Sequence, residues 1–305
     1  LSNFLNVSET KINISKYIGI KTLKEIKNIE SCHIEDGLAV LKFIIELKQK
    51  KINPKNEYEV SEILYKKRKE GINFFRNSFD YISAFDSNAA IVHYKPHSEN
   101  SLSSKNRNLL LIDSGAQYLE GTTDITRVIK IGAKNLSRVQ FSYTYLLKSL
   151  IRIENKIFPR NIRTTEIDLF IRKYLSKFNI TYNHGTGHGV GNFGDVHEKY
   201  PIISSRSNDI LVKNALFSIE PGYYVEGQFG LRIENLYVTK NINNSLKLKN
   251  VTLVPYDLDL VNFKLITNFE RNYIKKYHRE IYKTLKPRLS DDYGDYFIKN
   301  LINKI

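Results

Sequence analysis

The sequence predicts an α+β domain built around a curved antiparallel β-sheet. Helical and strand-like patterns come in blocks: two helices, a group of strands, two further helices and a second group of strands. The chain has 305 residues, of which 41% are hydrophobic and 26% are charged, as in ordinary globular proteins. Apolar runs such as residues 109–112 suit core strands, and none approaches the roughly 18–20 residues that cross a bilayer.

In the first half, helical spacing of apolar residues covers residues 31–50 and is broken by Asn53-Pro54. A second helix is expected from Asn56, with Glu59 three residues on as in a capping box, to Gly71. The strand patterns that follow are residues 79–85, 89–94 and 108–113, and then a hairpin with arms 116–118 and 122–131.

In the second half, helices are expected over residues 136–158 and 165–177. Residues 182–201 are rich in Gly and His and do not suit a regular helix. Further strands are expected at residues 215–221, 230–238 and 251–255. The end is predicted to be helical, because Thr267 and Glu270 form a capping box and residues 291–302 are amphipathic.

The formal charge is +15, but the basic residues are scattered, so we expect no nucleic-acid partner. The densest basic cluster, residues 66–69, lies in a helical pattern and is interpreted as a solvated helix face. A single cysteine, Cys32, fits a reducing compartment and predicts a cytoplasmic protein. The lack of a membrane-length apolar run predicts no membrane partner. The chain contains no Met, so Leu1 is not a translation start and we expect a piece of a longer precursor.

Four carboxylates at the ends of predicted strands and one histidine suggest a metal site. Each has an ordinary explanation when taken alone. Asp113 could be a turn residue, Asp124 could pair with Arg127 on the surface, Glu220 could face solvent, and Glu234 could pair with Arg232. The fifth residue is His188, which lies in the glycine-rich stretch.

Taken together, these residues predict a centre with two metal ions. A hairpin can bring Asp113 and Asp124 face to face, and two more strands can deliver Glu220 and Glu234 to the same surface. Four converging carboxylates repel one another and cannot all ionise without cations. Oxygen donors with one imidazole suit two divalent ions, with Mn²⁺ placed first and Co²⁺ or Zn²⁺ as alternatives. Such ions would lie about 3.5–4 Å apart around a bridging hydroxide, which is hydrolytic chemistry.

At these residues the chain resembles the pita-bread metallopeptidases, and within them the eukaryotic-type Xaa-Pro aminopeptidases (aminopeptidase P). The resemblance implies a curved antiparallel sheet flanked by two pairs of helices, with a C-terminal helical extension. The segments that carry it are AAIVHY (89–94), LLIDSGAQYLEGTTDITR (110–127), HGTGHGVGNFGDVHE (184–198), EPGYYVEGQFGLRIEN (220–235) and VTLVPYDL (251–258).

The resemblance also implies residue roles. Asp113 would chelate one ion, Asp124 and Glu234 would bridge both, and His188 and Glu220 would complete the other. Glu220 would also carry the proton of the attacking hydroxide. The predicted substrate contacts are His93 and His197 at the scissile carbonyl, His184 and Tyr224 at the proline pocket, and Arg232 supporting Glu234 and the surrounding network.

The implied activity is hydrolysis of the N-terminal Xaa-Pro bond of peptides. Three alternatives stay open: an Xaa-Pro dipeptidase, a methionine aminopeptidase, and a non-catalytic binding module of the same fold. Family members with this C-terminal tail usually carry two further domains before the catalytic one, and the tail often contributes to a homodimer. We therefore expect three parts: residues 1–24 as a linker or remnant of missing N-terminal domains, 25–265 as the catalytic domain, and 266–305 as the helical extension.

Overall fold

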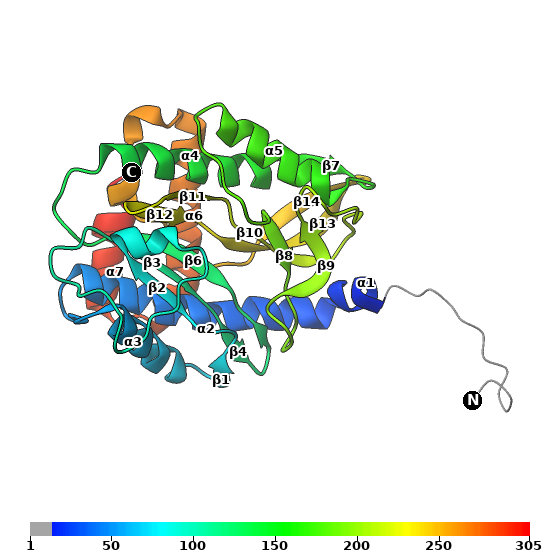
Figure 1. The fold of residues 1–305 in the computed structure, drawn as a ribbon. Helices are drawn as coiled ribbons and strands as arrows, with labels where there is room; N and C mark the ends of the chain where they lie inside the picture. The colour runs from blue at the N-terminus through cyan, green and yellow to red at the C-terminus, as the bar shows by residue number, and fades with distance from the viewer. Residues whose placement is uncertain (1–13) are drawn as a thin grey trace, which may run out of the picture.

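The computed structural model describes residues 14–305 and places antiparallel sheets in the middle of the molecule (Figure 1). All strand pairs are antiparallel, as predicted. The six-stranded sheet contains, in order, β7 (Ile157–Pro159), β14 (Ser245–Asn250), β13 (Asn235–Ile242), β10 (Leu216–Ile219), β8 (Gly187–Gly189) and β9 (Glu198–Ile203). The smaller sheets are β2 (Ile82–Phe85), β3 (Leu109–Ser114) and β6 (Ile125–Lys130); β1 (Phe74–Asn77), β4 (Ala116–Tyr118) and β5 (Gly121–Thr122); and β11 (Gly222–Val225) with β12 (Phe229–Arg232).

Two pairs of helices cover opposite sides of these sheets (Figure 1). One pair is α2 (Leu23–Lys48) with α3 (Glu57–Lys69), and the other is α4 (Ser137–Glu154) with α5 (Thr164–Ser176). The C-terminal part adds α6 (Asn268–Leu285), which begins with the predicted capping box, and α7 (Asp291–Phe297), which continues as a π-helical turn to Ile302. Within residues 14–305, no helix combines the length and apolarity that a membrane crossing needs.

Two apolar cores lie on the two sides of the sheets. The larger one joins α4, α5 and α6 to the six-stranded sheet, with Leu146, Phe217 and Ile274 fully buried. The second joins α2 and α3 to the β2–β3–β6 sheet around Phe43 and Leu110. Burial of one such side chain stabilises the folded state by about 1.5–3 kcal/mol. Together, the two cores hold in place the strands that carry the polar residues described below.

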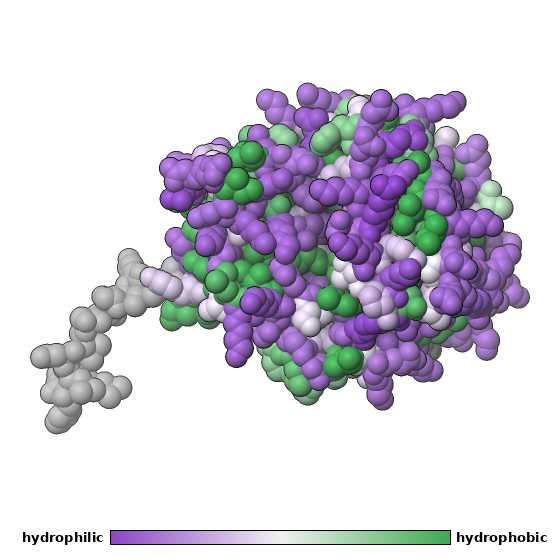
Figure 2. All heavy atoms as spheres, turned by 180° about the vertical axis from the view of Figure 1, so that it is seen from behind, coloured by the Kyte–Doolittle hydropathy of each residue, from purple (hydrophilic) through white to green (hydrophobic). Residues whose placement is uncertain are grey.

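Polar side chains spread over the rear face of the molecule, with smaller apolar areas between them (Figure 2).

On α3, the predicted solvated face is wrong for Arg68, which is 0% exposed and pairs with Asp36 at 2.7 Å. Lys66 and Lys69 do lie in solvent. The basic cluster at residues 66–69 therefore has exposed lysines and one arginine that is buried in an ion pair.

Helix α2 begins earlier than the apolar spacing indicates. Thr22 and Glu25 form a capping box that starts it at Leu23. Before it, helix α1 (Ile14–Gly19) packs against β9, and Ile20 pairs with Ala215. The described part of the expected linker over residues 1–24 is thus folded onto the domain, and residues 1–13 lie outside the described range.

Three strand predictions are wrong in detail. Residues 89–94 form no strand, because the chain enters a 3₁₀ helix at Asp86–Ala90 and the N–H of Ile91 bonds to Asn88. Residues 251–255 are not a strand either, since Arg127 takes the carbonyls of Val254 and Pro255. Residues 230–238 form two strands, β12 and β13, which belong to different sheets.

Candidate metal centre

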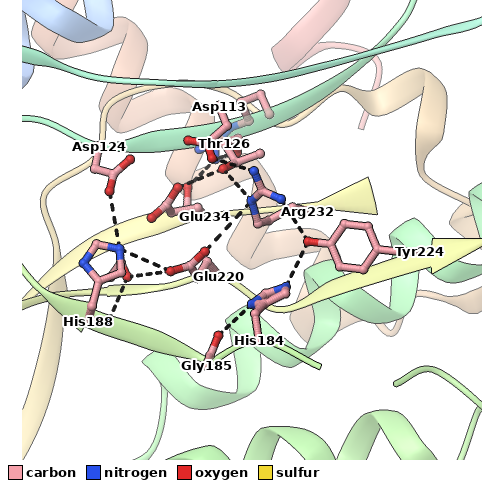
Figure 3. A network of polar contacts seen from close by, with 12 residues as sticks. Asp113, Asp124, Thr126, His184, Gly185, His188, Glu220, Tyr224, Arg232 and Glu234 are labelled. Carbon is pink, nitrogen blue, oxygen red and sulfur yellow. Dashed lines mark hydrogen bonds and ion pairs between the residues drawn. The ribbon is translucent and has the colours of Figure 1, made fainter. Parts of the chain in front are cut away.

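The five residues predicted as metal ligands converge on one cavity of about 780 Å³. Each comes from the end of a strand or from a short strand beside the others (Figure 3). Asp113 lies near the end of β3, Asp124 precedes β6, His188 is in β8, Glu220 follows β10, and Glu234 lies in the break between β12 and β13. The same cavity is lined by His93, His184, His197 and Arg232.

The ligand atoms of three of these residues lie close enough together to bind one metal ion. One ligand atom each of Asp124, His188 and Glu234 fall within 4.8 Å of one another. The Nε2 atom of His188 is 3.5 Å from Asp124 Oδ2 and 3.2 Å from Glu220 Oε1. Its Nδ1 donates to the carbonyl of Gly189 at 3.0 Å, which directs Nε2 at the carboxylates.

The remaining carboxylate, Asp113, is held by Arg232. The guanidinium Nη2 donates to Asp113 Oδ2 at 2.5 Å, and its Nε donates to Thr126 Oγ1 at 3.1 Å. Thr126 in turn donates to Glu234 Oε2 at 2.8 Å. The second oxygen of each acid, Asp113 Oδ1 and Glu234 Oε1, is buried without a hydrogen-bond partner. Buried carboxylate oxygens without partners are costly, so these atoms fit a cation as their missing partner.

The titration behaviour of the acids leads to the same conclusion. Burial raises the pKa of Asp124 well above its usual value, and the carboxylate of Glu234 adds to the rise. Burial raises the pKa of Glu234 in the same way, with Glu220 adding to it. Without cations, these two carboxyl groups therefore keep protons that free carboxyls would lose, whereas divalent ions would let them ionise.

Glu220 behaves differently from its neighbours. Burial acts to raise its pKa, but the hydrogen bond from His188 and the charges around it outweigh burial and lower the pKa to about 2. For His188, burial acts to lower the pKa, and the hydrogen bond to Glu220 raises it. The cluster thus contains one ionised carboxylate, Glu220, beside the imidazole, and three acids, Asp113, Asp124 and Glu234, whose pKa values are raised by burial.

A chain of hydrogen bonds connects Arg232 to the cavity wall (Figure 3). Arg232 Nη1 donates to Tyr224 OH at 2.9 Å, and that hydroxyl is 2.9 Å from His184 Nε2. His184 Nδ1 donates to the carbonyl of Gly185 at 2.7 Å, so Nε2 accepts from Tyr224. Burial lowers the pKa of His184, which favours this neutral form. Arg232 reaches Glu234 only through Thr126, rather than directly.

The two remaining predicted contacts lie at the cavity mouth. His197 stacks edge-on against His188 with 4.1 Å between ring centroids, and burial lowers its pKa. His93 is exposed and lies on the loop that follows the 3₁₀ helix at Asp86–Ala90. By contrast, His33 and His278 bond to backbone groups inside the protein, as expected for structural histidines.

Residues to which the sequence analysis gave no role in the site support it. Arg127 does not pair with Asp124, because its guanidinium donates to other groups. Its guanidinium donates to the carbonyl of Glu234 at 2.6 Å and to Asn235 Oδ1 at 2.8 Å. Ser218 accepts from the backbone N–H of His188 at 3.1 Å. The available signal was an arginine three residues after Asp124.

Residues 28–241 match the family model of metallopeptidase family M24, and residues 244–302 match that of the C-terminal region of the same peptidases. The chain is 36% identical over 294 residues to a probable Xaa-Pro aminopeptidase P from Sordaria macrospora, covering 92% of this chain and 48% of that protein. It is 38% identical over 275 residues to a putative Xaa-Pro aminopeptidase from Saccharomyces cerevisiae, covering 87% and 37%. The chain therefore spans half or less of these relatives.

Among solved structures, the X-prolyl aminopeptidase of Caenorhabditis elegans, described as a cytosolic enzyme with a di-nuclear active site, superposes with a TM-score of 0.89. It is 29% identical, and the match covers 95% of this chain and 49% of that one. Prolidase from Pyrococcus furiosus gives a TM-score of 0.63 at 26% identity, covering 78% and 66%. The architecture is thus the pita-bread fold predicted from the sequence, and the chain belongs to metallopeptidase family M24.

Proposed function

We propose that this chain is the catalytic part of a metal-dependent aminopeptidase that hydrolyses the N-terminal Xaa-Pro bond of peptides. The observation that supports it most is the convergence of Asp124, His188 and Glu234 beside two further carboxylates that line the same cavity. The similarity to Xaa-Pro aminopeptidases over most of the chain adds support. Two divalent ions, Mn²⁺ in our proposal, would supply Lewis acidity for the scissile carbonyl and an activated water at neutral pH.

The ligand assignment follows the donor atoms. Asp113 would hold one ion, through the oxygen that Arg232 leaves free. Asp124 and Glu234 would be shared by both ions, and His188 with Glu220 would complete the second. Glu220 is suited to accept a proton during hydrolysis, because it is held as a carboxylate beside His188.

The substrate contacts follow the cavity wall. His93 and His197 lie at the mouth, where their rings could donate to the scissile carbonyl as charge develops on its oxygen. An Xaa-Pro bond has no N–H, so the site must recognise the ring of proline. His184, supported by the hydroxyl of Tyr224, presents an aromatic surface for that ring, and Arg232 fixes Tyr224 in place.

Cleavage of a proline-containing tripeptide tests the proposal. We expect release of Arg from Arg-Pro-Pro in the presence of Mn²⁺ and little release from Arg-Ala-Ala. Arg-Pro would be hydrolysed poorly, whereas a dipeptidase would favour it. Asp124→Asn should lose nearly all turnover. No cleavage of any peptide by the metal-loaded chain would contradict the proposal, and an unchanged rate in Asp124→Asn would remove Asp124 from the site.

We further propose that residues 25–265 form the catalytic domain and residues 266–305 a helical extension, that the enzyme works in the cytoplasm, and that it forms a homodimer. Two family models match the chain, one for the peptidase and one for its C-terminal region, and they meet at residues 241–244, ahead of the boundary that we propose at residue 265. The buried free thiol of Cys32 fits a reducing compartment. Light scattering after size-exclusion chromatography tests the dimer, and a monomer mass at micromolar concentration would contradict it.

A further inference from the structure

The carboxylate of Glu57 is buried at the start of α3 and has no role in the proposed chemistry. Its residue is 0% exposed, and both oxygens accept hydrogen bonds. Oε1 accepts from the N–H of Phe85 at 2.6 Å, and Oε2 accepts from the N–H of Leu102 and the hydroxyl of Tyr94, both at 2.7 Å. The amide of Asn88 donates to both oxygens, at 3.2 and 3.1 Å. All these donors are neutral N–H, NH₂ or O–H groups.

These donors come from a single segment of the chain. Phe85 ends β2, Asn88 lies in the following 3₁₀ helix, and Tyr94 and Leu102 lie further along the loop. The N–H of Glu57 also donates to the carbonyl of Leu102 at 3.3 Å. Glu57 therefore fastens both ends and the middle of residues 85–102, a stretch without strand pairing between Phe85 and the isolated bridge that Ser103 forms with Asn56.

The other side of this loop faces the metal cavity. Val92, His93 and Lys95 line the cavity, and the exposed His93 ring has no hydrogen-bond partner within residues 14–305. The position of the His93 ring is therefore set by the backbone of the loop. The 3₁₀ helix before it packs closely on β12, since a Cβ added at Gly230 would lie 1.7 Å from the carbonyl oxygen of Ala89. The loop is thus confined between β12 on one side and Glu57 on the other.

We propose that Glu57 is a positioning residue that holds His93 at the mouth of the cavity. This inference rests on the proposed function, in which the His93 ring meets the scissile carbonyl. Glu57 itself does not line the cavity, so it acts through the loop. A clamp made of several short hydrogen bonds fixes the loop backbone to within the small tolerance that an oriented donor requires.

Glu57→Gln tests the clamp with little change in shape. In either orientation of the new amide, its NH₂ group replaces a carboxylate oxygen that accepted from N–H or O–H donors. Because NH₂ cannot accept, the hydrogen bonds of one of the two oxygens are lost. We expect kcat/KM for Arg-Pro-Pro to fall on the order of 10- to 100-fold, with metal content unchanged. The matched control is Glu59→Gln on the same helix, where the carboxylate accepts from Lys55 and touches no loop residue between 85 and 102; its activity should stay at the wild-type level.

A double-mutant cycle identifies the residue through which Glu57 acts. In a His93→Ala background, the additional effect of Glu57→Gln should shrink to less than about 2-fold, because the positioned group is gone. An undiminished effect in that background would overturn the inference. Tyr94→Phe removes one clamp bond and should reduce kcat/KM by less than Glu57→Gln does; it provides the same cycle if Glu57→Gln does not fold.

Hydrogen exchange separates this inference from the proposed function, because it requires no turnover. Residues 86–102 should exchange faster in Glu57→Gln than in the wild type, while β3 and β10 stay protected. An inactive wild-type chain would contradict the proposed function alone. Unchanged exchange of this loop would overturn the clamp, whatever the activity.

Discussion

Replacing Asp124 by Asn should stabilise the metal-free protein and remove most of the stabilisation by metal. Burial, followed by the charge of Glu234, raises the pKa of Asp124 in the folded state. The folded chain therefore holds a proton that the unfolded chain has lost, and its stability falls as the pH rises from the unfolded pKa toward the folded one. Each unit of pKa elevation corresponds to about 1.4 kcal/mol at high pH.

The magnitudes follow from this linkage. At pH 8, metal-free Asp124→Asn should melt at a higher temperature than the metal-free wild type, because the variant has no carboxyl group that folding must keep protonated. Two ions at 100 times their Kd should add about 2.7 kcal/mol each to the wild type, or roughly 10 °C in total. The variant should gain less than roughly 3 °C.

Differential scanning calorimetry with EDTA and with Mn²⁺ measures both effects. The matched control is Asp80→Asn, because Asp80 lines the same cavity but its side chain is 82% exposed. This control should keep the full response to metal. A metal-free Asp124→Asn protein that melts below the metal-free wild type, or that gains as much from Mn²⁺, would refute the reasoning.

Two further predictions concern the rest of the fold. Burial lowers the pKa of His278 to about 4, so wild-type stability should fall by about 3 kcal/mol as the pH drops from 6.5 to 4; in His278→Gln, urea denaturation should show a flatter pH dependence, and an identical slope would contradict the assignment. Asp36→Asn leaves the guanidinium of Arg68 buried without its charge partner. It should cost about 3–5 kcal/mol in urea unfolding, and a loss below about 1 kcal/mol would contradict this role.

The convergence of the five candidate ligands on one cavity could be predicted because each belongs to a recognisable local sequence pattern. Carboxylates that end apolar strands stand out, and antiparallel neighbours bring such ends together. The break that aims Glu234 into the cavity was not predicted, since residues 230–238 were interpreted as one strand. That break arises because β12 and β13 belong to two different sheets. Between them, the N–H of Glu234 donates to the carbonyl of Thr126.

Residues that act through tertiary contacts gave no comparable signal. An acidic residue in the first turn of a helix is common for reasons of helix electrostatics alone, so Glu57 could not be distinguished from Glu59. The apolar stretch at residues 89–94 suggested a strand, but its backbone turns through local hydrogen bonds from the N–H of Ile91 to Asn88 and from the N–H of Tyr94 to Ile91, and Ile91 is 56% exposed. Arg68 looked like one of four exposed cations because its partner, Asp36, lies on another helix.

Anomalous diffraction from crystals grown with Mn²⁺ tests the central claim most directly. The account predicts two peaks, about 3.5–4 Å apart, within the cavity lined by Asp113, Asp124, His188, Glu220 and Glu234. The free oxygens of Asp113 and Glu234 should then be occupied as ligands. No peak between these side chains at saturating Mn²⁺, or Mn²⁺ bound only elsewhere on the molecule, would contradict it.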